Sequence, residues 1–238
     1  MNLQLAYLGL TLFTLLMILY IGIKTINKTF LDPLQNKKKK ILFISLLLFW
    51  QTYIFGVATT GILQNYNFPP RFVIFFILPA FIFTGIFIYK NRNNQWIQNI
   101  PKQWLIYYQT FRLAVETLLA LSVTAGILHS NVTIHGYNYD MIFAFTAPFI
   151  AFLVFQKKVF NQKIVLLWNY LGLAVIASII FLFITTIYFP EFYGSETNLL
   201  STDFGKYPYI LVAGFLMPSA VFMHILSIVQ LNKGLESK

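Results

Sequence analysis

The chain has 238 residues, of which 58% are hydrophobic and 10% charged, and it contains no cysteine. Soluble proteins carry about 25% charged residues, so this composition excludes a water-soluble globular fold. The absence of cysteine excludes disulfides, thiol nucleophiles and cysteine-ligated metal clusters. The net charge of +10 does not indicate a nucleic-acid partner, because in a membrane protein the distribution of basic residues between loops reports topology instead.

Seven apolar segments follow one another along the chain. Each is close to the length of about 20 residues that a helix needs to cross about 30 Å of hydrocarbon. The sequence therefore predicts an all-α bundle of seven transmembrane helices, forming a single domain over residues 1–238. The predicted spans are 3–23, 41–63, 72–89, 104–128, 140–156, 164–189 and 208–231.

The basic residues concentrate in alternate connections between these spans. Because lysine and arginine favour cytoplasmic loops, this pattern predicts an outside N-terminus and a cytoplasmic C-terminus. The lysine run is interpreted as an orientation signal beside anionic lipid, with a specific lipid-binding site as the alternative. The residues on the predicted inner side are Lys24, Lys28, Lys37, Lys38, Lys39, Lys40, Lys90, Arg92, Lys102, Lys157, Lys158, Lys163, Lys233 and Lys238.

Three predicted spans contain a proline near the middle: Pro79, Pro148 and Pro218. Each proline lacks an N–H and blocks the carbonyl four residues earlier, which predicts a kink and a carbonyl that a neighbouring side chain must satisfy. Three such kinks together favour a cavity in the bundle. The alternative is that proline is simply more frequent in transmembrane helices.

The fourth predicted span carries Gln109, Arg112 and Glu116 on one helical face. A charged side chain at the bilayer centre costs at least about 2.5 kcal/mol, so this face is predicted to point into the bundle. The i,i+4 spacing of Arg112 and Glu116 suggests that they pair. Two interpretations stay open: a ligand or proton site, and an ion pair that only ties helices together.

Gln51, Asn169 and His224 are predicted to reach a similar depth in the second, sixth and seventh spans. Together with the fourth span they would line one polar chamber. A neutral imidazole beside a carboxylate suits a proton relay between His224 and Glu116. The alternative for a single membrane histidine is an ordinary hydrogen bond between helices.

A second polar cluster is predicted on the outer side, formed by Arg71, His135, Asn138 and Asp140. Asp140 is expected to cap the N-terminus of the fifth span. We expect no metal, because the histidines lack the spacing of known zinc motifs. Residues 208–231 contain no lysine, which excludes the attachment of retinal there, and no other cofactor is predicted.

A weak internal repeat is also present. Trp50-Gln51 in the second span and Trp168-Asn169 in the sixth are each followed by a glycine and then by two prolines. Two three-helix units joined by the fourth helix would resemble the parallel repeats of some small transporters. Chance recurrence of a short dipeptide is the alternative.

Several short motifs lie along residues 69–231: Pro69-Pro70-Arg71, Gln109-x-x-Arg112-x-x-x-Glu116, Gly136-x-Asn138-x-Asp140, Ala147-Pro148, Asn169-x-x-Gly172 and the segment from Pro218 to His224. Together these motifs resemble a group of bacterial seven-helix membrane proteins of similar length. This resemblance implies a bacterial cytoplasmic membrane but no activity.

The buried polar residues favour a small-molecule or ion permease, with protons exchanged by Glu116 and His224. Two other functions stay open: a membrane sensor that reports a ligand to a cytoplasmic partner, and an intramembrane enzyme acting on a lipid or isoprenoid substrate. The expected partners are membrane lipids and an unidentified small molecule or ion. The sequence assigns no catalytic residue and no oligomeric state.

Overall fold

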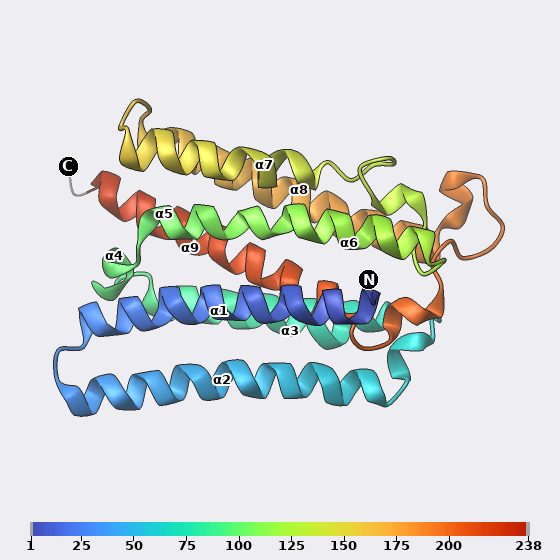
Figure 1. Ribbon diagram of the computed structural model, residues 1–238, viewed down its shortest axis with the longest axis horizontal. Helices are drawn as coiled ribbons and strands as arrows, with labels where there is room; N and C mark the ends of the chain where they lie inside the picture. The colour runs from blue at the N-terminus through green and yellow to red at the C-terminus, as the bar shows by residue number, and fades with distance from the viewer. Residues whose placement is uncertain (1, 237–238) are drawn as a thin grey trace.

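The computed structural model describes residues 2–236, and over that range it contains helices and connecting turns but no strand. The long helices lie side by side along the long axis of the molecule, and the two chain ends point toward opposite ends of that axis (Figure 1). Lys238, which was expected to add to the basic C-terminal tail, lies outside the described residues. The fold class predicted from composition is therefore confirmed as all-helical.

Five helices among residues 2–236 are long and apolar enough to cross a membrane. They correspond to the first, second, third, sixth and seventh predicted spans. A sixth apolar helix, over Asp140–Gln156, is shorter. Three of the five are α1 (Leu3–Thr29), α2 (Pro33–Thr59) and α8 (Gln162–Tyr188). The other two are the segment Val73–Asn91, which includes α3 (Leu78–Asn91), and the segment Val212–Lys233, which includes most of α9 (Met217–Glu236) and the π-helical segment before it.

The predicted span 104–128 is also helical, but it is divided. α5 (Lys102–Tyr107) is followed by a 3-10 segment, Tyr108–Phe111, and then by α6 (Arg112–Thr124). The short helix α4 (Trp96–Asn99) precedes α5. The 3-10 segment lies directly before Arg112, so the regular helix α6 begins at the charged residue.

α1 and α2 extend beyond their predicted spans where the two helices meet. α2 ends at Thr59 and α6 at Thr124, each four residues before the predicted end, whereas α1 continues to Thr29 and α2 begins at Pro33 instead of near residue 41. The reason is local, because Asp32 accepts a hydrogen bond from the Gln35 amide at 2.8 Å and Pro33 occupies the first turn. Lys37–Lys40 consequently lie on α2, whereas we expected them in a loop.

α7 (Asp140–Ala151) continues into a π-helical segment, Phe152–Gln156, and both ends match the predicted fifth span. The preceding connection, residues 125–139, contains turns and one short 3-10 helix, Ser130–Val132. In Figure 1 α7 begins part of the way along the bundle, not at the end where α6 stops. The connection therefore folds back along the bundle and places Asp140 beside the middle of other helices.

Two prolines are preceded by matching distortions of the helix. The π-helical segment Val73–Ile77 comes shortly before Pro79, and the π-helical segment Val212–Leu216 comes shortly before Pro218. The two π-helical segments pack against each other. The same distortion therefore occurs in the third and seventh predicted spans, at positions that pack together.

Two aromatic side chains of α2 satisfy the carbonyls that these prolines leave free. The Tyr53 hydroxyl donates to the Phe75 carbonyl at 3.0 Å, and Trp50 Nε1 donates to the Gly214 carbonyl at 2.9 Å. These acceptors lie four residues before Pro79 and Pro218, where proline removes the regular helical bond. The predicted need for an outside donor is confirmed for Pro79 and Pro218, but among the described residues no side chain donates to the Ala144 carbonyl, four residues before Pro148.

α9 lies at the centre of the bundle and α2 at its edge. In the most apolar 18-residue stretch of the segment containing α9, 72% of the residues are buried. In the corresponding stretch of α2 only 11% are buried. α9 packs against α8, α5 and α3. α2 leaves Leu48, Phe49 and Phe55 exposed, at 63%, 68% and 50%, so its outer face is suited to lipid and not to water.

We predict that Trp50→Phe destabilises the protein by about 1–3 kcal/mol, because the Gly214 carbonyl loses its donor in an apolar setting. In a Pro218→Ala background the penalty should be smaller, since alanine restores an amide N–H for the same carbonyl. Thermal unfolding in detergent measures this difference from four proteins: the unchanged chain, Trp50→Phe, Pro218→Ala and the double variant. Equal penalties in both backgrounds would contradict this account of Trp50.

Candidate functional site

The site is built around Arg112, the first residue of α6, of which only 3% of the side chain is exposed. Its guanidinium forms a two-pronged ion pair with Asp140. Arg112 Nε donates to Asp140 Oδ2 at 2.7 Å, and Arg112 Nη2 contacts Asp140 Oδ1. Such fork-to-carboxylate pairing is among the strongest polar contacts in proteins. It joins α6 to the first turn of α7.

The third nitrogen of the guanidinium contacts neutral groups. Arg112 Nη1 donates to Gln109 Oε1 at 3.3 Å and lies 3.1 Å from His224 Nε2. Gln109, itself fully buried, donates from Nε2 to the Ala220 carbonyl at 3.1 Å. Arg112 is therefore connected to α9 both directly and through Gln109.

These contacts determine the protonation state of His224. A guanidinium only donates, so the Nε2 atom of His224 must accept from Arg112 and cannot carry a proton. The proton then lies on Nδ1, which is 2.8 Å from Asn169 Oδ1 and donates to it. His224 is thus a neutral imidazole in the arrangement that the structure describes.

Asn169 of α8 continues the chain of polar contacts. Its Nδ2 donates to the Val165 carbonyl at 2.8 Å and to Ser227 Oγ at 3.0 Å. Asn169 is fully buried and Ser227 is 2% exposed. A continuous polar chain therefore runs from Asp140 through Arg112 and His224 to Asn169 and Ser227, crossing from α7 to α6, α9 and α8.

A glycine on α8 makes room for the histidine. A Cβ atom at Gly172 would lie 2.6 Å from His224 Cε1 and 2.8 Å from His224 Nε2. On the same helix the Trp168 ring packs against the imidazole, with ring centroids 5.3 Å apart. Gly172 and Trp168 therefore position the ring that accepts from Arg112.

Glu116 has different partners from those expected. Its Oε1 accepts from the Ile134 amide at 2.7 Å, and its Oε2 accepts from Asn138 Nδ2 at 3.4 Å. Within residues 2–236 no ion pair joins Glu116 to Arg112, so the pairing suggested by the i,i+4 spacing is wrong. Asp140 takes the guanidinium because it approaches from another helix and offers both oxygens.

Asn138 connects the two carboxylates of the site. Its Nδ2 contacts Glu116 and the Val132 carbonyl, and its Oδ1 accepts from the Asp140 amide at 3.0 Å. We expected Asp140 to cap the N-terminus of this helix. Asp140 is instead the first residue of α7, and its side chain does not cap the helix. Its carboxylate is occupied by Arg112, so the capping contact to its amide comes from Asn138.

Three predicted residues lie outside this cluster. Gln51 is on the peripheral helix α2, and its Nε2 has no hydrogen-bond partner among the described residues. Arg71 donates to the Ile62 carbonyl at 3.0 Å, and His135 is exposed on the connection that contacts Glu116. The polar cluster therefore joins α6, α7, α8 and α9, whereas we expected a chamber that α2 would share.

Two members of the site were not identified as such from sequence. Ser227 lies three residues after His224 on the same face of α9, so helical spacing could have indicated it. The contact between Gly172 and His224 joins two helices and leaves no signal in the sequence. Within residues 2–236 no group of three or more His, Cys, Asp or Glu side chains is placed to hold a metal ion.

Comparison with known proteins assigns no family to the chain. No family model matches it, and it matches neither a curated protein nor a solved structure. The resemblance to a group of bacterial seven-helix proteins stays a prediction. Function must therefore be argued from the geometry of the site.

We predict that Asp140→Asn destabilises the protein by about 3 kcal/mol or more, because it leaves the Arg112 cation buried without a counter-charge. The matched control is Asp203→Asn, which removes the carboxylate of the half-exposed Lys206–Asp203 pair and should cost no more than about 1 kcal/mol. Thermal unfolding in detergent compares the two variants. Equal penalties would show that Arg112 does not depend on Asp140.

We also predict that Gly172→Ala destabilises the protein, because the added methyl group collides with the His224 ring. The control is Gly85→Ala on α3, where an added Cβ meets no atom within 4 Å, and where alanine should be neutral or stabilising by up to about 1 kcal/mol. The penalty at Gly172 should largely disappear in a His224→Ala background. If it persists there, another neighbour causes the clash.

Proposed function

We propose that the chain is a permease that carries a small anionic solute together with protons across the cytoplasmic membrane of a bacterium. The observation that supports this proposal is the buried Arg112–Asp140 pair, held between apolar helices and extended by His224. A guanidinium that faces a carboxylate with one N–H hydrogen bond and a second ion-pair contact could face the carboxylate or phosphate of a solute in the same way.

Charge balance favours the coupling of anion and proton. The pair of Arg112 and Asp140 is neutral as a whole, which is the state least costly to keep in the membrane. An anion that replaces the Asp140 carboxylate would add one negative charge to the site. Protonation of Asp140 removes that charge, so one proton entering with each anionic charge keeps the site neutral.

Glu116 and His224 are suited to exchange these protons on two sides of Arg112. Glu116 contacts the connection 125–139 and is linked to Asp140 through Asn138, which favours a role in passing protons from that side. His224 Nε2 accepts from Arg112, so it becomes free to take a proton when the guanidinium turns to the solute. Asn169 and Ser227 would continue the path beyond His224.

The proposal includes seven membrane spans with the N-terminus outside and the C-terminus in the cytoplasm. Five helices satisfy length and apolarity by themselves, and residues 102–124 and 140–156 would supply the other two. The turn between α1 and α2, the turn between α7 and α8 and the C-terminus all lie toward one end of the bundle in Figure 1. Basic residues are concentrated in these segments, which favours the cytoplasm for that end.

The proposal is tested with purified protein in liposomes that enclose a pH-sensitive dye. Inorganic phosphate, sulfate and succinate are each added outside, and at least one should acidify the interior. Glu116→Gln should slow this acidification at least about tenfold, because glutamine cannot pass a proton. Glutamine keeps an oxygen that can accept from the Ile134 amide, so the variant should still fold.

The matched control is Glu196→Gln, which neutralises an exposed carboxylate on the connection after α8. It should transport at the rate of the unchanged protein. The proposal is wrong if none of the three anions drives proton uptake, or if Glu116→Gln transports as fast as the control.

A further inference from the structure

A cavity of about 280 Å³ lies between α1, α2, α3 and α9, away from the site around Arg112. Most of its wall is apolar, including Phe43 of α2, Phe87 of α3 and Phe222 of α9. It exists because α2 packs loosely against the bundle and buries only Ile54 and Ala58. An apolar cavity of this kind is suited to a hydrocarbon chain.

The length of the cavity matches one leaflet of a membrane. Its wall on α1 extends from Ile18 to Thr29. At about 1.5 Å per residue this stretch rises roughly 16 Å, which is close to half of the hydrocarbon thickness of about 30 Å. An acyl chain of a membrane lipid therefore fits the cavity along its length.

The cavity opens sideways, toward the lipid-facing side of α2. Leu42 and Leu46 line it, yet 53% and 49% of these side chains are exposed. A buried pocket closed on all sides would cover both leucines. A lipid can therefore enter from the membrane without passing through the bundle.

A cation lies at one end of this apolar wall. Lys39 lines the cavity near Phe30, with its Nζ 5.5 Å from the centre of that ring. Three polar residues also line the cavity near the C-terminal ends of α1 and α3: Thr25, Thr29 and Asn91. The end of the cavity is thus polar and basic, whereas its length is apolar.

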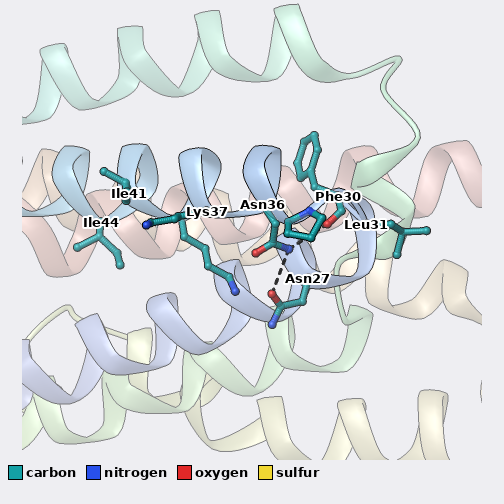
Figure 2. Close-up of a pocket in the computed structure, with 9 residues that line it drawn as sticks. Asn27, Phe30, Leu31, Asn36, Lys37, Ile41 and Ile44 are labelled. Carbon is teal, nitrogen blue, oxygen red and sulfur yellow. Dashed lines mark hydrogen bonds between the residues drawn. The ribbon is translucent and has the colours of Figure 1, made fainter.

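Lys37, Lys38 and Lys40, which neighbour Lys39 on α2, do not line the cavity that Lys39 lines. Lys37 and Lys40 line a separate, open cavity of about 530 Å³, shown in Figure 2. There Asn36 Nδ2 donates to Asn27 Oδ1 at 3.2 Å and to the Phe30 carbonyl at 3.0 Å, which ties α1 to α2. Lys38 lines neither cavity.

We propose that the cavity between α1, α2, α3 and α9 binds one anionic phospholipid, with an acyl chain along the apolar wall and the phosphate at Lys39. The combination of an apolar groove one leaflet long, a lateral opening and a cation at its end matches the parts of such a lipid. This inference does not depend on transport, because it involves none of the residues around Arg112.

Native mass spectrometry tests the proposal on the full chain in detergent. Phosphatidylglycerol and phosphatidylcholine with the same acyl chains are offered at equal concentration. One phosphatidylglycerol should be retained in preference to phosphatidylcholine by about fivefold, as expected for one lysine near a headgroup of net negative charge, because choline offsets the phosphate charge of phosphatidylcholine. Lys39→Gln should remove this preference.

Two matched controls make the result specific. Lys38→Gln removes the same charge from the same turn and should leave the preference unchanged. Leu46→Trp should block the groove and abolish retention of the lipid, whereas Leu48→Trp, on an exposed position of α2 outside the cavity, should not. The proposal is overturned if the two lysine variants lose binding equally, or if Leu46→Trp retains lipid as well as Leu48→Trp.

Discussion

A guanidinium buried between apolar helices requires a counter-charge and partners for all of its N–H groups. Arg112 imposes this requirement on the fold, and its partners come from α7, from α9 and from the 3-10 segment before α6. Asp140 supplies the charge, while Gln109 and His224 supply neutral acceptors. These partners are themselves hydrogen-bonded. Asp140 contacts Asn138, His224 contacts Asn169, and Asn169 contacts Ser227.

The same constraint explains features that lie far from the site. Pro79 and Pro218 free carbonyls that water cannot reach, and Tyr53 and Trp50 provide the missing donors. Both donors come from α2, which otherwise packs loosely and exposes much of its length. Helix α2 is therefore attached to the π-helical segments Val73–Ile77 and Val212–Leu216 of the neighbouring spans. The loosely packed remainder of its inner face borders the cavity proposed to hold lipid.

The arrangement around Arg112 separates two carboxylates that have different surroundings. Asp140 balances a cation, whereas Glu116 accepts only neutral donors from the connection 125–139. Asn138 contacts both residues, so a rearrangement of this connection would affect both at once. The proposed exchange of protons rests on this difference between the two carboxylates and on the neutral imidazole of His224, which contacts the same guanidinium.

Composition and the length of the apolar segments determined the helical class and the positions of the long helices. The cost of placing polar groups in hydrocarbon, which can be judged along a single helix, determined that five side chains point inward: Gln109, Arg112, Glu116, Asn169 and His224. The positions of Pro79 and Pro218 likewise predicted that the Phe75 and Gly214 carbonyls need outside donors. Helical spacing alone gave the wrong partner for Arg112, since proximity along one helix competes with a carboxylate that arrives from another. Only the tertiary structure decided that Asp140 pairs with Arg112, that Gly172 makes room for His224 and that Gln51 stays apart, because these contacts depend on how the helices and the connection 125–139 pack.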